Sequence, residues 1–141
     1  QWALFYNHYV VVGCEWSVSV IRNSSSSPHM LAGFYVSDDH IVPSDRENII
    51  EAGSQAGLVP PFEAIQFDGK LLVKDFLNKP SNESLTLDDA LLATVTSNPA
   101  EPLFGTLWGQ TVEPGGTSTC SYVLTLTFDV IFSEPKDLAT S

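Results

Sequence analysis

Few residues of this chain have the types and spacing to do chemistry, and the densest group is Asp38-Asp39-His40. Carboxylates and imidazoles can bind metal ions. However, adjacent residues of a strand point to opposite faces, and no second histidine or cysteine lies at a ligand-like spacing. We therefore expect this group to be a solvated loop, and we predict neither a metal site nor any other cofactor.

The pattern needed for nucleophilic catalysis is also missing. The histidines His8, His29 and His40 show no base–nucleophile arrangement, and no serine stands in a G-x-S-x-G motif. Residues 113–116, E-P-G-G, lack the lysine and the following helix of a phosphate-binding loop. The sequence therefore predicts that the protein is not an enzyme.

The chain is strongly acidic, with six Lys and Arg against 17 Asp and Glu and a formal net charge of −11. Such a surface repels phosphate, so these residues alone should not bind nucleic acid tightly. Cys14 and Cys120 are expected to be buried free thiols, with one disulfide between two strands as the alternative. The sequence has no run of about 18 apolar residues, so we expect no transmembrane helix.

Strands must position any functional residues of this chain, and the clearest strand pattern covers residues 122–132. Every second residue from Tyr122 to Phe132 is apolar, whereas the alternate face is mixed. This alternation predicts a long strand, which we place at the centre of a sheet. Residues 5–22 predict a second long strand, with a bulge at Gly13-Cys14 that lets it bend.

The remaining pattern is also rich in strands. We expect strands at residues 30–36, 62–69, 70–76, 93–96 and 103–112, and a helical turn within residues 85–92. The capping box Ser44-x-x-Glu47 predicts a helix of about two turns that ends at Gly53. This pattern predicts one all-β domain over residues 1–141, a β-sandwich or jelly roll with one or two short helices in loops.

Four large aromatic residues are candidates for contact with another subunit. Trp2, Phe5 and Tyr6 open the chain, and Trp108 lies in the strand expected at residues 103–112. Large apolar side chains at such positions either fill the core or are buried against another subunit. Both alternatives remain open from the sequence.

Several stretches together resemble the capsid proteins of circular, Rep-encoding single-stranded DNA viruses, the circovirus-like group. Residues 5–23, F-Y-N-H-Y-V-V-V-G-C-E-W-S-V-S-V-I-R-N, are similar to that family's Y-x-x-Y-x-V-x-G-S-x-x-x-V-x-F-x-N stretch. Residues 31–39 (L-A-G-F-Y-V-S-D-D), 74–78 (K-D-F-L-N) and 93–100 (A-T-V-T-S-N-P-A) follow in the family's order. Residues 122–138 resemble its last strand and short tail. The resemblance covers nearly the whole chain.

Two departures accompany the resemblance. The family's proteins begin with an arginine-rich arm and a first jelly-roll strand, and neither is among these 141 residues. The missing arm accounts for the acidic balance, and we expect the chain to start partway through a larger product. Cys14 stands where the family motif has serine, which is a nearly isosteric change.

The resemblance implies a single jelly-roll capsid subunit, about sixty copies of which form a small icosahedral shell around a circular single-stranded DNA genome. The absent arm would make most of the genome contacts, and Arg22, Lys70 and Lys74 are candidates for further contacts on the inner face. Surface loops would carry the contacts with a host receptor. The family places the protein in the virion, and in the host nucleus during assembly.

A β-sandwich carbohydrate-binding module that uses exposed tryptophan and tyrosine is the alternative function, because fold alone does not decide between the two. A binding module is expected to be monomeric, whereas a capsid protein must self-associate.

Overall fold

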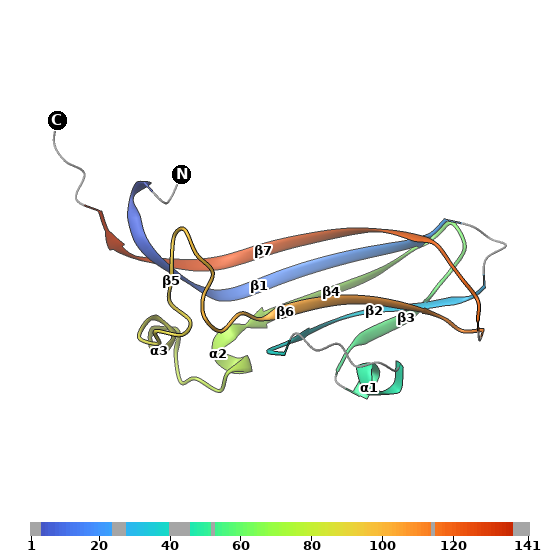
Figure 1. The fold of residues 1–141 in the computed structure, drawn as a ribbon, viewed down its shortest axis with the longest axis horizontal. Helices are drawn as coiled ribbons and strands as arrows, with labels where there is room; N and C mark the ends of the chain where they lie inside the picture. The colour runs from blue at the N-terminus through green and yellow to red at the C-terminus, as the bar shows by residue number, and fades with distance from the viewer. Residues whose placement is uncertain (1–3, 24–27, 40–45, 52, 114, 137–141) are drawn as a thin grey trace. The chain divides into compact units, whose positions relative to one another are not determined.

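The computed structural model describes residues 4–23, 28–39, 46–51, 53–113 and 115–136, and in these residues the chain is mostly β (Figure 1). The strands are β1 (Tyr6–Arg22), β2 (Met30–Ser37), β3 (Gln55–Val59), β4 (Ala64–Leu72), β5 (Ala93–Thr94), β6 (Phe104–Thr111) and β7 (Cys120–Pro135). Three short helices are α1 (Arg46–Glu51), α2 (Val73–Phe76) and α3 (Asn82–Thr86).

The described strands form two antiparallel sheets. One has four strands in the order β4-β1-β5, with β7 paired to β1, and the other has three in the order β3-β2-β6. In the three-stranded sheet, β2 pairs with β6 from Met30↔Thr111 to Ser37↔Phe104, and with β3 from Met30↔Val59 to Phe34↔Gln55. The prediction of a mostly β fold is confirmed, and the two sheets are consistent with a β-sandwich. The described residues contain three short helices, where one or two were expected.

The chain divides into two compact units. The first comprises residues 1–15, 70–102 and 126–141, and the second comprises residues 16–69 and 103–125. Strands β1, β4 and β7 each contribute one part to either unit. The single domain expected from the length stays a prediction.

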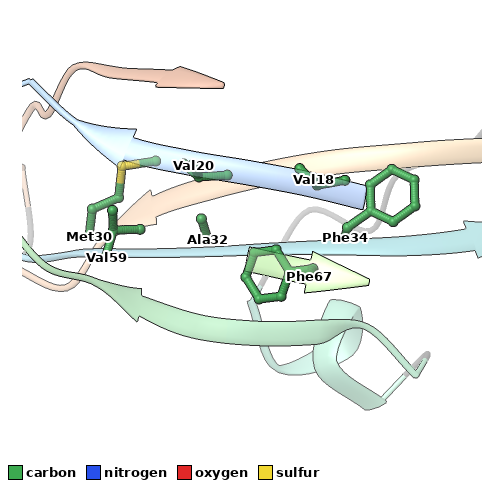
Figure 2. Close-up of a cluster of buried hydrophobic side chains, with 7 residues drawn as sticks. All are labelled: Val18, Val20, Met30, Ala32, Phe34, Val59 and Phe67. Atoms are coloured by element: carbon green, nitrogen blue, oxygen red, sulfur yellow. The ribbon is translucent and has the colours of Figure 1, made fainter. Parts of the chain in front are cut away.

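The core of the second unit lies between strands of both sheets (Figure 2). Its seven buried side chains come from β1, β2, β3 and β4: Val18, Val20, Met30, Ala32, Phe34, Val59 and Phe67. On β1 and β2 these residues are spaced by two, as expected for strands that bury one face. Burying such side chains is the main favourable term in folding, at about 25 cal/mol per Å² of apolar surface.

A second cluster in the same unit packs helix α1 onto the three-stranded sheet. Ile49 of α1 lies with Tyr35 and Trp108, and Leu31 packs against them. The Trp108 indole Nε1 donates a hydrogen bond of 2.7 Å to the Ser54 hydroxyl, which pairs the polar atom of this buried ring. The three-stranded sheet therefore has apolar side chains packed on both faces.

The first unit has buried residues of its own. Val10 and Val12 of β1 are buried, as are Val73, Leu85, Leu91 and Ala93. Helix α3 brings Leu85 into this interior, and the Ser81 hydroxyl caps the helix by accepting a bond of 3.3 Å from the Ser84 amide. Even a five-residue helix is useful here because it places one fully buried leucine.

Several expected elements differ from those observed. Residues 70–76 divide between the end of β4 and helix α2, and β3 forms where no strand was expected. Helix α3 begins three residues before the region 85–92 in which a helical turn was expected, whereas α1 lies where a helix was expected. The capping residue Ser44 lies outside the described residues.

The central placement of the last strand was wrong. Among the described residues, β7 pairs with β1 alone, so it lies at the edge of its sheet.

Candidate functional site

Strand β7 is unusual on the described surface because it is both apolar and exposed. Its residues 121–129 are all exposed, so neither face of this stretch is covered. The exposed apolar side chains of β7 in the second unit are Tyr122, Val123 and Leu124. In the first unit they are Leu126, Phe128 and Ile131, with 44%, 54% and 36% of their surfaces accessible.

The exposure of β7 contrasts with the burial of its neighbour. Within the first unit, Val10 and Val12 of β1 keep only 1% and 8% of their surfaces accessible. Strand β7 pairs with β1 along one edge, and no second strand pairs with its other edge among the described residues. An apolar strand with a free edge is a surface that can bind another strand.

The opening aromatic residues lie close to the far end of β7 in the first unit. The Tyr6 ring stacks on the Phe132 ring with 5.4 Å between centroids, and Tyr6 is half-buried. Phe5 is 45% exposed, and its carbonyl accepts a 2.7 Å bond from the Lys136 amide. These contacts extend the apolar surface of β7 onto the start of β1.

The other two aromatic candidates have different positions. Trp108 is buried within the second unit, so its place is in the core and not on an open surface. Trp2 lies outside the described residues, as does His40 of the Asp38-Asp39-His40 group.

Arg22 does not offer an open cation, contrary to what an inner-face contact requires. Only 2% of its surface is accessible. Its Nη1 donates a bond of 3.1 Å to the Pro28 carbonyl, and among the described residues its buried Nε has no hydrogen-bond partner. A buried guanidinium without a carboxylate is costly, because desolvating the charge is repaid only by good pairing.

The two lysine candidates both lie in the first unit. Lys70 Nζ lies 2.6 Å from Glu15 Oε1, and this hydrogen bond raises the pKa of Lys70. Lys74 is half-buried on α2, where its carbonyl accepts a 2.7 Å bond from the Lys79 amide. Lys70 is therefore already engaged by a carboxylate, which weakens its attraction for phosphate.

Acidic side chains near β7 affect the thiol of Cys14 in the first unit. Burial raises the pKa of Cys14, and the nearby carboxylates of Asp129 and Glu15 raise it further. Both cysteines, Cys14 and Cys120, are free thiols, as expected, but each is only partly buried, whereas full burial was expected. Asp129 is also one of only two acidic residues along the sixteen residues of β7, the other being Glu134.

The histidines of the described residues pair with glutamates. His8 Nδ1 lies 2.9 Å from Glu134 in the first unit, and His29 Nδ1 lies 3.0 Å from Glu113 in the second. The hydrogen bond from His29 lowers the pKa of Glu113. No group of three or more potential metal ligands occurs in the part of the chain that the structure describes.

No family model, curated protein or solved structure matches this chain. Within the described ranges, no helix has the length and apolar character to cross a membrane.

The sequence revealed the residues of this surface but not its exposure. The alternation of residues 122–132 identified the strand, and its length and apolar face led us to place it at the centre of a sheet. The polar residues Thr125, Thr127 and Asp129 of the mixed face allow contact with water, but nothing in the alternation indicated that the apolar face is exposed too.

Proposed function

We propose that this chain is the shell-forming domain of a viral capsid protein, which self-assembles into a small icosahedral particle around circular single-stranded DNA. The finer fold that we propose is a single jelly roll. Support comes from the resemblance, which runs in order along nearly the whole chain, and from two antiparallel sheets packed around an apolar core. The function of such a protein is assembly and not catalysis.

One observation supports self-assembly more than any other, namely the apolar edge strand β7. Soluble monomers rarely expose contiguous apolar surface, and they protect long edges with charges, prolines or bulges. Residues 121–128 of β7 are exposed and contain no charged residue. A strand of this kind is costly for a protein that stays monomeric, but it is useful to one that must bind further polypeptide.

The acidic charge fits a division of roles within the capsid protein. A net charge of −11 opposes contact with DNA phosphates, so the genome would be held mainly by the basic arm that the resemblance implies. Shells gain stability from many repeated contacts, so each interface can be modest. Location in the virion, and in the host nucleus during assembly, belongs to the same proposal.

A carbohydrate-binding module has less support. Such modules stack sugars on exposed aromatic rings, preferably tryptophan. Of the described tryptophans, Trp108 is buried and Trp16 is half-buried against Phe34, with 5.7 Å between the ring centroids. Tyr122 remains as an exposed aromatic residue for this alternative.

Electron microscopy of the complete gene product tests the proposal. The product is expressed with whatever precedes Gln1, purified and treated with nuclease. We expect uniform closed shells that protect single-stranded DNA. A product that stays monomeric across salt and protein concentration would contradict the capsid function, and binding to a glycan array would then favour the alternative.

A further inference from the structure

One charged side chain of the second unit is buried at the end of its apolar core. On β1 every second residue from Val18 to Arg22 is buried, and Val18 and Val20 belong to the core cluster (Figure 2). The guanidinium of Arg22 donates one hydrogen bond, to the Pro28 carbonyl, and pairs with no carboxylate of the described residues. We propose that this guanidinium binds a small tetrahedral oxyanion of the phosphate or sulfate type.

The charge of the guanidinium supplies the first reason. Arginine side chains stay protonated in proteins, so burial of their charge is not relieved by loss of a proton. A buried charge without a counter-charge is destabilising, whereas an anion that accepts hydrogen bonds from it compensates the lost hydration. The carboxylate of Glu113 does not fill this place, because it lies 3.0 Å from Nδ1 of His29 and is engaged there.

The remaining donors supply the second reason. The Nε of Arg22 is buried and has no hydrogen-bond partner among the described residues. In a guanidinium the Nε–H and one Nη–H point in the same direction, and this fork matches two oxygens of a single anion. The hydroxyl of Ser118 is a second buried group without a partner among the described residues.

The serine hydroxyl lies on the same side of the strands as the guanidinium. The side chains of Asn23 and Ser121 are joined by a hydrogen bond of 3.1 Å, so these two residues share one face. Because side chains alternate along a strand, Arg22, Ser118 and Cys120 lie on the other face, and Cys120 indeed packs against the core cluster. A tetrahedral oxyanion has a third oxygen for the hydroxyl, which a carboxylate lacks.

The burial of Arg22 indicates a small ion and not a segment of polypeptide. Only 2% of the residue is accessible, so the chain itself already covers the guanidinium. A carboxylate carried by another molecule, or the backbone of a DNA strand, would have to displace this cover. A free ion can instead be enclosed as the chain folds around it. The inference therefore concerns the interior of one unit and does not rest on the proposed self-assembly.

Thermal unfolding in inorganic phosphate, compared with chloride at equal ionic strength, measures the site. The chain is refolded in each salt, so that entry of the ion into a closed interior does not limit binding. An ion that binds the folded chain alone raises Tm, by about 5 °C for each tenfold increase in phosphate above its dissociation constant. Sulfate should act in the same way, whereas chloride has no second oxygen for the fork.

Variants of Arg22 separate anion binding from a general salt effect. Arg22→Met should abolish the phosphate-dependent rise in Tm, and it should keep or raise Tm without phosphate because the uncompensated charge is gone. Arg22→Lys keeps the charge but loses the fork, so most of the rise should be lost. Lys74→Met is the matched control, because it removes one positive charge from the first unit and should leave the rise unchanged.

A second position keeps the test independent of whether the Arg22 variants fold. Ser118→Ala removes one neutral donor, and it should weaken phosphate binding by about 5-fold while the circular dichroism of the folded chain is kept. An unchanged phosphate response in Ser118→Ala would place the ion elsewhere and refute the site.

Three further results would overturn the inference. An equal rise in Tm for Arg22→Met would show that phosphate acts on the surface as a general salt. No rise in the unsubstituted chain up to about 100 mM phosphate would show that the guanidinium takes no such ion. A rise with a short oligodeoxynucleotide but not with inorganic phosphate would show an open contact for nucleic acid in place of an enclosed ion.

Discussion

Substituting Gly33 with alanine tests how closely the three-stranded sheet is packed. Gly33 lies in the central strand β2, opposite Ala56 of β3 and Trp108 of β6. A Cβ at this position would meet the Gln55 carbonyl oxygen and lie 2.8 Å from two carbons of the Trp108 ring. Carbon atoms at ordinary contact are about 3.5 Å apart or more, so the ring would have to move by about 0.7 Å.

The cost of this movement can be estimated. Overpacking a core usually destabilises a protein by about 1–3 kcal/mol. Replacing glycine with alanine also restricts the unfolded chain, which stabilises the folded state by about 0.4–1 kcal/mol. Because a backbone oxygen is one of the atoms in the way, we expect a net loss of about 2 kcal/mol. Should the ring move away from Ser54, the unpaired indole N–H would add about 1–3 kcal/mol.

Gly109→Ala is the matched control in the neighbouring strand. Its Cβ would meet the terminal methyl of Met30, and the next atoms lie at 3.8 Å or beyond. A methionine end is flexible and can move aside, so the loss should stay below about 1 kcal/mol.

Thermal and urea unfolding, followed by tryptophan fluorescence, compare the two variants. At about 4 °C per kcal/mol for a chain of this size, Gly33→Ala should lower Tm by about 8 °C and Gly109→Ala by less than about 4 °C. Equal midpoints for the two variants would refute the close approach of Trp108 and β3 to Gly33.

Three further results are expected. Leu85→Ala, at a residue with no accessible surface, should lower the free energy of unfolding by about 2–5 kcal/mol in urea titration; a loss below about 1 kcal/mol would contradict its burial. Near pH 9, iodoacetamide should label Cys14 more slowly in the folded than in the unfolded chain, and Asp129→Asn should speed the folded reaction, because removing that carboxylate lowers the raised pKa. The pKa values of Glu113 and Asp88 are lowered by their hydrogen bonds to His29 and Lys79. The hydrogen bonds of these two carboxylates therefore stabilise the fold fully above the ordinary carboxyl pKa, which is 4.5 for Glu113 and 3.8 for Asp88. This stabilisation is lost as the pH falls through the lowered pKa of each folded-state carboxyl. Asp88→Asn should reduce this acid sensitivity in unfolding titrations, and an unchanged pH dependence would count against the pair.

The sequence predicted strands where period-two alternation was strong, and it failed where local preference and tertiary context disagreed. Residues 5–22 and 30–36 correspond closely to β1 and β2. Strand β3 was missed because Gln55 and Gly57 are poor strand formers, yet pairing with β2 holds them extended. Helix α2 was missed for the opposite reason, since Val73 and Phe76 favour strands.

The candidate surface was predictable only in part. Alternation shows which face of residues 122–132 is apolar, but it does not say whether anything covers that face. Arg22 shows the same limit, because a terminal arginine in an alternating strand usually reaches solvent, and here it is buried.

By itself the sequence determined that the chain is mostly β, that residues 122–132 form a long strand with an apolar face, and that the chain carries a net charge of −11. These properties are local or additive, so they can be derived from residue types and spacing. Only the tertiary structure decided that β7 pairs with β1 alone among the described residues, and that Trp108 and Arg22 are buried. Strand order and burial depend on residues distant in sequence, and no local pattern encodes which strand lacks a neighbour.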